Sequence, residues 1–293
     1  MKIAFLTCHD LLQGAAVRRA DAFEHDLQLA ALREGLAGRA EVAEIDWRSP
    51  IDAFEGFDVA LLGTAWDYQD RAEEFIARLD ELTACGVDVR NRPEVARWNI
   101  EKGYLQSLAQ HGARTIPTLW RDDPGEADVA EAFDHFGCDR VVVKRAVGAG
   151  AYGQCDFTPA TPPQPGWRLG QPGLIQPFLP SIVSEGEYSA IFAGGEFSHT
   201  LVKRAAPGDY RIQSLYGGVE SPATLGVDDM RDARAVYDAL PFDDLLYARI
   251  DMVRGADGRL LLMEAELVEP YLYPAQGPQV GKLLAEALIA KRR

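Results

Sequence analysis

Cysteine is scarce in this sequence, and its spacing excludes the motifs that depend on it. The 293 residues include four cysteines, namely Cys8, Cys85, Cys138 and Cys155, and no two stand in a C-x-x-C spacing. That spacing excludes a zinc motif that is local in sequence, and four scattered cysteines do not form the pattern of a disulfide framework. We expect reduced, mostly buried thiols in a cytoplasmic protein.

Long apolar runs are also absent. No apolar stretch approaches the roughly 20 residues that a membrane helix needs. The N-terminal run Lys2–Thr7 is short, and it lacks the charged start, the long apolar region and the cleavage site of a signal peptide. These absences again favour a cytosolic protein.

Basic residues are in deficit. The chain has 30 Lys and Arg against 45 Asp and Glu, which gives a net charge of −15. Sequence-independent binding to nucleic acid needs a basic surface that displaces counterions from phosphate, and an anionic membrane attracts basic clusters. We therefore expect no nucleic-acid partner and no membrane partner. The acidity is typical of a protein kept soluble by its charge, and a metal site would involve only a few of the carboxylates.

Residues 1–95 contain an alternation of strand and helix patterns. Strands are expected at 2–7, 41–46, 57–63 and 87–90, and helices at 20–37 and 70–84. This order predicts an α/β domain with a parallel sheet and helices on both faces. Pro93 marks a break after it. No G-x-G-x-x-G follows a strand here, which argues against a dehydrogenase built on this domain.

Residues 96–293 follow a different pattern, that of an α+β domain with hairpins. Helices are expected at 99–111, 127–136, 227–240 and 279–291. Strands are expected at 115–119, 140–144, 173–179, 188–193, 196–203, 246–253 and 259–265. The Gly194-Gly195 pair between two of these strands is a hairpin signal. The activity must be read from the site, because one fold supports many activities.

A glycine-rich segment follows the strand that ends at Lys144. It is the run Gly148–Gly153, with the sequence GAGAYG. Glycine lets backbone N–H groups approach an anion closely, and a lysine at the strand end adds a compact positive charge. The segment is neither a Walker A motif nor a dinucleotide fingerprint. It indicates a cradle for nucleotide phosphates, and a flexible turn beside a solvated lysine is the alternative.

Three acidic residues stand in apolar strand patterns near the C-terminus. Asp251 lies in the run YARIDMV, and Glu264 and Glu266 lie in LLMEAEL. Residues i and i+2 of a strand point to the same face, so Glu264 and Glu266 face the same way. Adjacent carboxylates repel one another unless a cation lies between them, and carboxylate oxygens suit Mg²⁺. The pattern indicates a magnesium site, with the solvated face of an edge strand as the alternative.

Together these residues resemble the ATP-grasp superfamily over about residues 99–280, and in particular its prokaryotic glutathione synthetase branch. The run Gln176–Ile182 is similar to the linker that contacts adenine there, and Glu185-Gly186-Glu187 is similar to an acidic turn of that branch. The family's spacing is also kept by Lys102, Lys144, Lys203, Gly208, Arg211, Gln213, Gly217 and Gly218. Glu266 departs from the family because it replaces the usual Asn, which keeps an oxygen ligand but adds negative charge.

The N-terminal half resembles a narrower group, similar to the cyclo-ligase that closes O-ureidoserine to cycloserine. The similarity is carried by Ala65-Trp66-Asp67-Tyr68, Arg71, Phe75, Arg97-Trp98-Asn99, Lys102, Leu105 and Phe197-Ser198-His199. The resemblance implies an N-terminal parallel-sheet domain of residues 1–95 and an ATP-grasp domain of residues 96–293. The latter would divide into a small lid subdomain at about 112–180 and a central and C-terminal subdomain at about 181–293.

The resemblance also implies a site. Lys203 and Arg211 are expected to act in catalysis, with Arg211 stabilising the acylphosphate and the oxyanion that follows. The residues expected to bind ATP are Lys102, Lys144, Gly148, Gly150, Ala151, Tyr152, Gly153, Gln176, Pro177, Phe178, Leu179, Glu185 and Glu187. Asp251, Glu264 and Glu266 would hold one or two Mg²⁺ ions, with Mn²⁺ as a substitute. Substrate contacts are expected from Trp66, Asp67, Tyr68, Gln213, Gly217 and Gly218, with a packed loop as the alternative for 66–68.

The implied activity is that of an ADP-forming ligase acting on a small amino-acid-type substrate. ATP would phosphorylate a carboxylate-like group, and attack on the acylphosphate would form a C–N bond. Phosphoryl transfer needs positioning and charge neutralisation, which agrees with the cations, glycines and carboxylates found here. Two alternatives stay open: a cyclo-ligase acting within one ureido amino acid, and a regulatory protein that binds ATP without catalysis. The sequence specifies neither the substrate nor whether a homo-oligomer forms.

Overall fold

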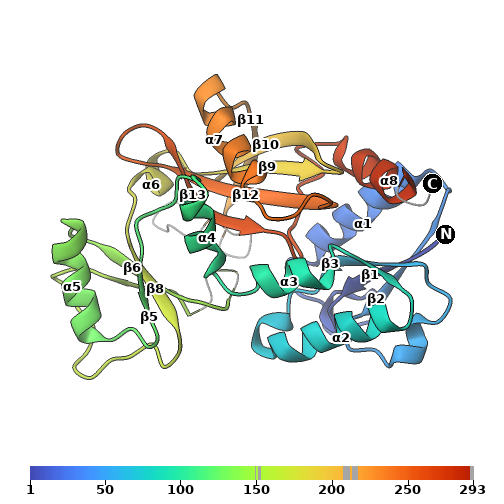
Figure 1. Cartoon of the computed structure of the whole chain (residues 1–293), viewed down its shortest axis with the longest axis horizontal. Coiled ribbons are helices and arrows are strands. Elements are labelled where there is room, and N and C mark those ends of the chain that lie inside the picture. Colours follow the sequence, from blue (N-terminus) through green and yellow to red (C-terminus); the bar gives the residue numbers. More distant parts are fainter. Residues whose placement is uncertain (149, 151–152, 207–211, 213–216, 291–293) are drawn as a thin grey trace.

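The computed structural model of the protein describes residues 1–148, 150, 153–206, 212 and 217–290. Its strands form three β-sheets, with helices packed around them. Figure 1 shows the sheet of the N-terminal strands at the right and a four-stranded sheet with one helix at the left. A five-stranded sheet runs across the middle. One parallel and two antiparallel sheets confirm the predicted combination of α/β and α+β structure.

The N-terminal sheet has the strand order β2-β1-β3-β4, and all its pairs are parallel. Its elements are β1 (Lys2–Thr7), η1 (His9–Leu11), α1 (Ala22–Leu36), β2 (Glu41–Asp46), η2 (Ile51–Phe54), β3 (Val59–Thr64), η3 (Tyr68–Arg71), α2 (Ala72–Ala84) and β4 (Asp88–Arg90). Every residue of β3 is buried, as is typical of a parallel strand covered on both faces. The strands and helices predicted for this part of the chain are confirmed, with small shifts at their ends.

Pro93 separates the last strand of the N-terminal sheet from the helices that follow. It is the first residue of α3 (Pro93–Asn99), and α4 (Tyr104–Gln110) follows. Proline suits the first helical position because the N–H of that residue has no partner within the helix. The single helix predicted at 99–111 is therefore wrong, and Lys102 lies in the link between two shorter helices.

The five-stranded sheet is antiparallel, with the order β11-β10-β9-β12-β13. Its strands and the helices around it are α6 (Ser181–Ser184), β9 (Glu187–Ala193), β10 (Glu196–Arg204), β11 (Val219–Ala223), α7 (Val227–Asp238), β12 (Tyr247–Arg254), β13 (Leu260–Glu266) and α8 (Val280–Ala290). The pairing of β9 with β10 confirms the hairpin predicted at Gly194-Gly195. The sequence did not predict β11, which contains Pro222 and lies at one edge of the sheet.

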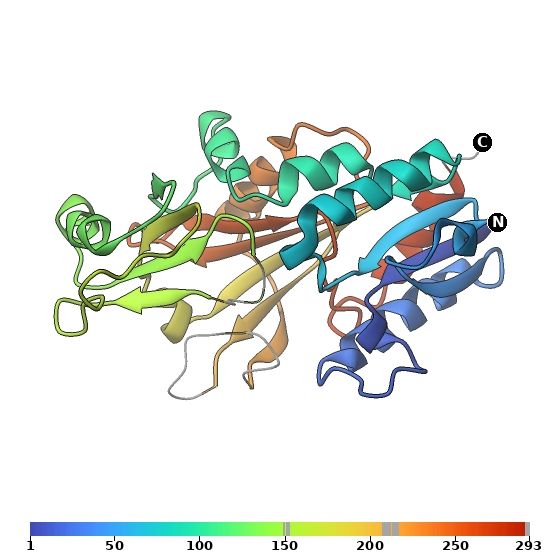
Figure 2. The same cartoon turned by 90° about the horizontal axis from the view of Figure 1, so that it is seen from below.

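The four-stranded sheet is also antiparallel, with the order β5-β8-β6-β7. Its elements are β5 (Leu119–Arg121), α5 (Glu126–Phe136), β6 (Val141–Arg145), β7 (Cys155–Phe157) and β8 (Gly173–Pro177). It has a small core of its own, in which Val129 of α5 packs with Val141 and Ile175. Figure 2 shows this sheet as a separate layer beside the five-stranded sheet.

The four cysteines are free, but they are not mostly buried as predicted. Cys8 is buried, whereas Cys85 is exposed and Cys138 and Cys155 are half-buried. Cys85 follows the last residue of α2, where the helix reaches the surface. Among the residues that the structure describes, no helix is long and apolar enough to cross a membrane.

The last helix returns to the N-terminal domain, where α8 packs against α1 (Figure 1). Two glycines allow this close approach. A Cβ atom added at Gly35 would lie 2.1 Å from the carbonyl oxygen of Gly281, and one at Gly281 would lie 2.0 Å from that of Ala31. Leu284 and Leu288 of α8 accordingly share a core with β1 and β3. The two ends of the chain therefore stabilise one another.

Gly281→Ala should lower the free energy of unfolding by about 1–3 kcal/mol, because the added methyl group forces two backbones apart. Urea unfolding of the purified protein measures the change. Gly103→Ala is a matched control, because Gly103 has helical angles (φ −51°, ψ −24°) and an added methyl group would be 3.9 Å from its nearest neighbour. Equal effects of the two substitutions would show that the helix contact is not tight.

Candidate active site

A cavity of about 560 Å³ lies where the three sheets approach one another. Its wall combines the N-terminal domain, the four-stranded sheet, the five-stranded sheet and the segment after β13. The predicted site residues that line it are Trp66, Asp67, Lys102, Lys144, Gly148, Gly150, Glu187, Lys203, Asp251, Glu264 and Glu266. The fold therefore brings these eleven of the predicted residues to one place.

Two paired strands form the carboxylate part of the wall. In the antiparallel pair of β12 and β13, Asp251 lies directly opposite Glu264, and Arg249 lies opposite Glu266. Directly opposite side chains share one face of a sheet, so the three carboxylates point to the same side. The register shifts just after Asp251, at a β-bulge. Bulges beside active sites re-aim side chains, which is consistent with the position of this one.

Arg249 lies among these carboxylates and was not predicted. Its guanidinium group donates to both oxygens of Asp251, at 3.0 and 3.1 Å, to Glu266, and to the carbonyl oxygen of Tyr271 at 3.1 Å. Burial lowers the pKa of Arg249, but the carboxylates of Asp251 and Glu266 raise it above its ordinary value. The sequence signal for it was its position two residues before Asp251, on the same face of the strand.

A second buried cation, Lys203 of β10, joins Asp251 to Glu187. Its Nζ atom forms an ion pair with Glu187 and lies 3.3 Å from Asp251, and the three side chains are all nearly inaccessible to water. Burial disfavours the charged form of Lys203, but Asp251 and Glu187 raise its pKa above the ordinary value. Burial alone would raise the pKa of Asp251, whereas Arg249 and Lys203 hold it below the ordinary value. Lys203 therefore faces the cavity as an ammonium group.

Two further lysines lie beside the glycine-rich segment. Lys102 Nζ lies 2.9 Å from a carboxylate oxygen of Glu264 and donates to the carbonyl oxygen of Gly148 at 2.5 Å. Burial lowers the pKa of Lys144, an effect that Glu264 partly offsets. The two lysines thus approach the same carboxylate from different elements, the link before α4 and the strand β6.

The described glycines of the glycine-rich segment have two kinds of surroundings, the large cavity and the side chain of Arg145. Gly148 and Gly150 line the large cavity. Gly153 has a φ of 69°, and a Cβ atom added there would lie 3.1 Å from the side chain of Arg145, so it packs on that side chain. Ala151 and Tyr152 lie outside the described residues.

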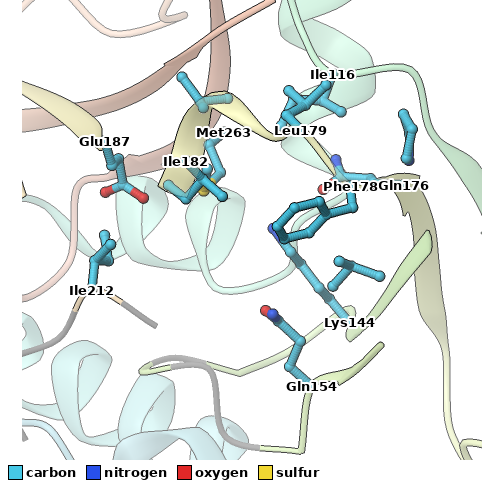
Figure 3. Close-up of a pocket in the computed structure, with 13 residues that line it drawn as sticks. Ile116, Lys144, Gln154, Gln176, Phe178, Leu179, Ile182, Glu187, Ile212 and Met263 are labelled. Carbon is cyan, nitrogen blue, oxygen red and sulfur yellow. The ribbon is translucent and has the colours of Figure 1, made fainter. Parts of the chain in front are cut away.

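A smaller and mostly apolar cavity of about 90 Å³ opens beside the lysines (Figure 3). It shares Lys144, Gln154 and Glu187 with the large cavity. Its other described lining residues are Ile116, Val142, Gln176, Pro177, Phe178, Leu179, Ile182, Ile212, Val253 and Met263, with Ile212 and Met263 also shared. All four linker residues predicted to bind ATP are among them. The ring of Phe178 lies 3.8 Å from the guanidinium carbon of Arg140, which covers it from the side of β6.

Glu185 and Glu187, the two acidic residues predicted to bind ATP, have different surroundings in the structure. Glu187 lines both cavities, whereas Glu185 lines neither and pairs with Arg254 at 2.8 Å. Gly186 lies between them with a φ of 107°, and a Cβ atom there would lie 2.3 Å from the carbonyl oxygen of Lys203. The turn at this glycine breaks the alternation of a regular strand, so Glu185 and Glu187 do not share a site.

The predicted substrate residues also divide. Trp66 and Asp67 line the large cavity, and the Trp66 indole N–H donates to the carbonyl oxygen of Glu269 at 2.9 Å. Tyr68 is buried behind the cavity wall, where its side chain hydrogen-bonds to Glu269 and stacks on Phe75, with ring centroids 4.9 Å apart. Gly217 and Gly218 line neither cavity. Arg211 and Gln213 lie outside the described residues.

One part of the wall carried no sequence motif. It is formed by Arg19, Asp21, Glu24, Gln69, Asp70, Glu269, Tyr271 and Tyr273. Arg19 donates to both oxygens of Asp21 at 2.8 Å, and its guanidinium carbon lies 5.6 Å from the centre of the Trp66 ring. The Tyr273 ring lies 5.7 Å from Lys203 Nζ and 5.6 Å from the guanidinium carbon of Arg249. This part of the wall combines charge with aromatic faces.

The carboxylates have the donor chemistry that Mg²⁺ prefers, namely hard oxygens. In this arrangement they contact basic side chains: Glu264 contacts Lys102, Asp251 contacts Lys203 and Arg249, and Glu266 contacts Arg249. Among the described residues, no three acidic, histidine or cysteine side chains are grouped closely enough to hold an ion. The donor set fits Mg²⁺, and ion binding would require the basic side chains to release these contacts.

Arg249→Met should lower the free energy of unfolding by about 3–5 kcal/mol, because it removes the cation shared by the buried Asp251 and the partly buried Glu266. Chemical denaturation of the full chain measures this. Arg231→Met is the control, since Arg231 is 65% exposed, pairs with Asp228 on its own helix, and should change stability by less than about 0.5 kcal/mol. A similar small change at Arg249 would mean that water solvates these carboxylates.

Comparison with known proteins gives one family model and one curated relative. The model of the D-cycloserine synthetase DcsG N-terminal domain matches residues 3–91. The cycloserine biosynthesis protein DcsG of Streptomyces lavendulae is 29% identical over 273 residues, which cover 84% of this chain and 88% of that protein. The similarity therefore extends from the N-terminal domain through most of the chain.

Solved structures share the fold. The crystal structure of D-cycloserine synthetase DcsG has a TM-score of 0.81 at 23% identity and covers 100% of both chains. D-alanine–D-alanine ligase of Bacillus anthracis, complexed with ATP, has a TM-score of 0.68 at 16% identity and covers 99% of this chain and 96% of its own. The ATP-grasp ligase PsnB, complexed with a minimal precursor, Mg and ADP, has a TM-score of 0.65 at 14% identity, over 100% and 97%. The chain has the fold of the ATP-grasp ligases, and its predicted resemblance to them and to the enzyme of cycloserine biosynthesis is confirmed.

Proposed function

We propose that this protein is an ATP-dependent ligase that phosphorylates a carboxylate-like group of a small amino-acid-type substrate and then forms a C–N bond, releasing ADP and phosphate. The supporting observation is the set of four basic side chains that lines one cavity with three carboxylates, next to an apolar pocket. The basic side chains are those of Lys102, Lys144, Lys203 and Arg249. Phosphoryl transfer depends on such positioned charges and needs little covalent chemistry from the protein.

The nucleotide would occupy the two connected cavities. The base would enter the small apolar cavity against Phe178, and Glu187, which lines both cavities, lies where a ribose would follow. Lys144 and Lys102 would then bind the phosphates, with the backbone of the Gly148–Gly153 segment beside them. The complex of D-alanine–D-alanine ligase with ATP supports a nucleotide in this fold.

Asp251, Glu264 and Glu266 would hold one or two Mg²⁺ ions. When bound, Mg²⁺ neutralises charge on the phosphates and on the transferred group. With these carboxylates on the metal, Arg249 would lose its contacts with Asp251 and Glu266, and Lys203 would lose its contact with Asp251 but keep its ion pair with Glu187. These two cations would then stabilise the phosphorylated substrate and the oxyanion formed when the nucleophile attacks. Arg211 retains its proposed catalytic role, although it lies outside the described residues.

Closure of a ring within one ureido amino acid is the second candidate, and the relatives favour it over the joining of two molecules. The N-terminal family model and the relative over most of the chain both carry the name of cycloserine synthesis. The N-terminal domain supplies Arg19, Trp66 and Asp67 to the cavity, so the matched part of the chain includes substrate-facing side chains. A ureido amino acid such as O-ureidoserine is thus the first substrate to test.

A regulatory protein that binds ATP without catalysis is the third candidate. The presence of every charged residue in the described part of the site argues against it, because the three carboxylates, the three lysines and Arg249 all line the cavity. Catalysis would take place in the cytoplasm, where ATP is available. A homo-oligomer stays a prediction.

Incubation of the purified protein with Mg²⁺-ATP and a panel of ureido amino acids, amino acids and short peptides should release ADP and phosphate only with a substrate. Glu264→Gln should reduce kcat/KM by about 100-fold or more, because it weakens the metal site that neutralises the transferred phosphoryl group. Glu185→Gln is the matched control: it removes the same charge from a residue outside both cavities. AMP and pyrophosphate as products would contradict the acylphosphate mechanism.

The mass of the product separates ring closure from ligation. Ring closure consumes one ureido amino acid for each ADP and, where the product is a cycloserine, also releases the carbamoyl group of the substrate, whereas ligation consumes an acceptor and a donor for each ADP. We expect one substrate consumed per ADP released when O-ureidoserine is supplied alone. A requirement for a second amino acid would reject the cyclo-ligase and retain the ligase.

A further inference from the structure

A hydrogen-bond relay at the edge of the small cavity fixes which way one buried amide points. Gln176 belongs to β8 and is 3% exposed, and its Nε2 donates to the hydroxyl oxygen of Thr118 at 3.0 Å. The Thr118 hydroxyl in turn donates to the carbonyl oxygen of Ile116 at 2.8 Å. Thr118 lies just before β5, which pairs with β8, so the relay joins two neighbouring segments of the sheet.

The chemistry of the threonine hydroxyl sets the direction of the relay. A hydroxyl group has one proton, and a carbonyl oxygen such as that of Ile116 can only accept. The proton of Thr118 is therefore committed to Ile116, and its oxygen can only accept from Gln176. The amide of Gln176 must present its NH₂ group to Thr118, which leaves its carbonyl oxygen for a ligand. The reverse orientation would place the amide oxygen against a hydroxyl oxygen whose proton is already donated to Ile116, so the relay favours one orientation.

The side-chain oxygen of Gln176 can select among ligands because the cavity around it is mostly apolar. Most side chains that line the small cavity are apolar, and Gln176 lies next to Phe178 on its wall (Figure 3). The charged lining residues are Lys144 and Glu187, and Glu187 is paired with Lys203. A polar group that faces a ligand atom with which it cannot hydrogen-bond reduces the binding free energy far more in an apolar cavity than in water. An acceptor at this position thus selects for a donor on the ligand.

We propose that Thr118 is a positioning residue for base specificity, which holds the Gln176 amide so that the cavity accepts a purine with an exocyclic amino group at position 6 and rejects one with an oxo group there. The proposal rests on the proposed function, since it takes the small cavity as the site of the base. It assigns to Thr118, which no motif marked, the selection of ATP over a 6-oxopurine nucleotide.

Isothermal titration calorimetry of the full chain with ATP and with inosine triphosphate tests the proposal without turnover. The wild type should bind ATP at least about tenfold more tightly, which is the effect of one matched hydrogen bond against a mismatched one. Thr118→Val keeps the shape but removes the hydroxyl, so the amide can turn and offer its NH₂ group to a 6-oxo group. The ratio of the two dissociation constants should then fall by about tenfold, mainly through tighter binding of inosine triphosphate.

Two further variants separate positioning from a structural role. Thr118→Ser keeps the relay and should keep the ratio of the wild type. The glutamate of Gln176→Glu has two accepting oxygens and no NH₂ group, so it presents an acceptor to the ligand whichever way it turns. The double variant Thr118→Val and Gln176→Glu should therefore regain the preference for ATP. A structural defect would weaken both nucleotides alike and leave their ratio unchanged.

The outcomes distinguish the inference from the function on which it rests. An unchanged ratio in Thr118→Val, or a change as large in Thr118→Ser, overturns the role of Thr118. Equal affinity of the wild type for both nucleotides, with ATP-dependent turnover intact, overturns the inference and leaves the function standing. Failure of the wild type to bind either nucleotide overturns both.

Discussion

Two buried cations, Lys203 and Arg249, hold the centre of this protein together. They lie on β10 and β12, the two strands that flank β9, and between them contact Glu187, Asp251 and Glu266. Without them the β12–β13 pair could not carry acidic residues on a face turned into the molecule, because an unpaired buried charge costs several kcal/mol. The same pairing prepares the site for its ligands. In the proposed reaction the phosphates would contact the cations and Mg²⁺ would contact Asp251 and Glu266, while Glu187 keeps its ion pair with Lys203.

This exchange needs a frame that keeps the groups in place while their partners change. The carboxylates are on paired strands, and Lys203 is on β10 of the same sheet. Lys144 and Gln176, which would contact the nucleotide, are on strands of the other antiparallel sheet, which has its own small core. The N-terminal sheet adds Trp66 and Asp67 directly after its central strand β3. The contact of α8 with α1 fastens that sheet to the rest, so a helix far from the chemistry supports the geometry of the cavity.

Local pattern was sufficient where burial alone decides the structure. The apolar runs of β1, β3 and β6 and the shared face of Glu264 and Glu266 follow from side-chain periodicity, and the structure agrees. Local pattern failed where one residue changes the backbone. Pro93 begins a short helix, and the single helix predicted at 99–111 is replaced by α3 and α4; the positive φ of Gly186 separates Glu185 from Glu187.

Residues whose roles depend on tertiary contacts were missed. Arg249 stands two residues before Asp251 on the same face of its strand, but its contact with Glu266 depends on the register of the partner strand. Arg19 precedes the first long helix in a segment with no motif, and Tyr273 follows the last strand with a φ of 50°. Their roles arise because distant segments meet at the cavity. The same holds for Thr118, whose hydroxyl matters only because Gln176 comes next to it in the sheet.

The charge of the whole cavity constrains how its ligands arrive. Its described wall contains the basic residues Arg19, Lys102, Lys144, Arg145, Lys203 and Arg249 and the acidic residues Asp21, Glu24, Asp67, Asp70, Glu187, Asp251, Glu264, Glu266 and Glu269. Acidic side chains thus outnumber basic ones, nine to six. Burial raises the pKa of Glu269 well above its ordinary value and raises the pKa of Glu187 and of Glu266 to about 7, which reduces the excess. A bare nucleotide is strongly anionic, and the carboxylates that stay ionised would repel it. A nucleotide that enters with Mg²⁺ already bound would meet these carboxylates with a cation, and the arrangement therefore favours it.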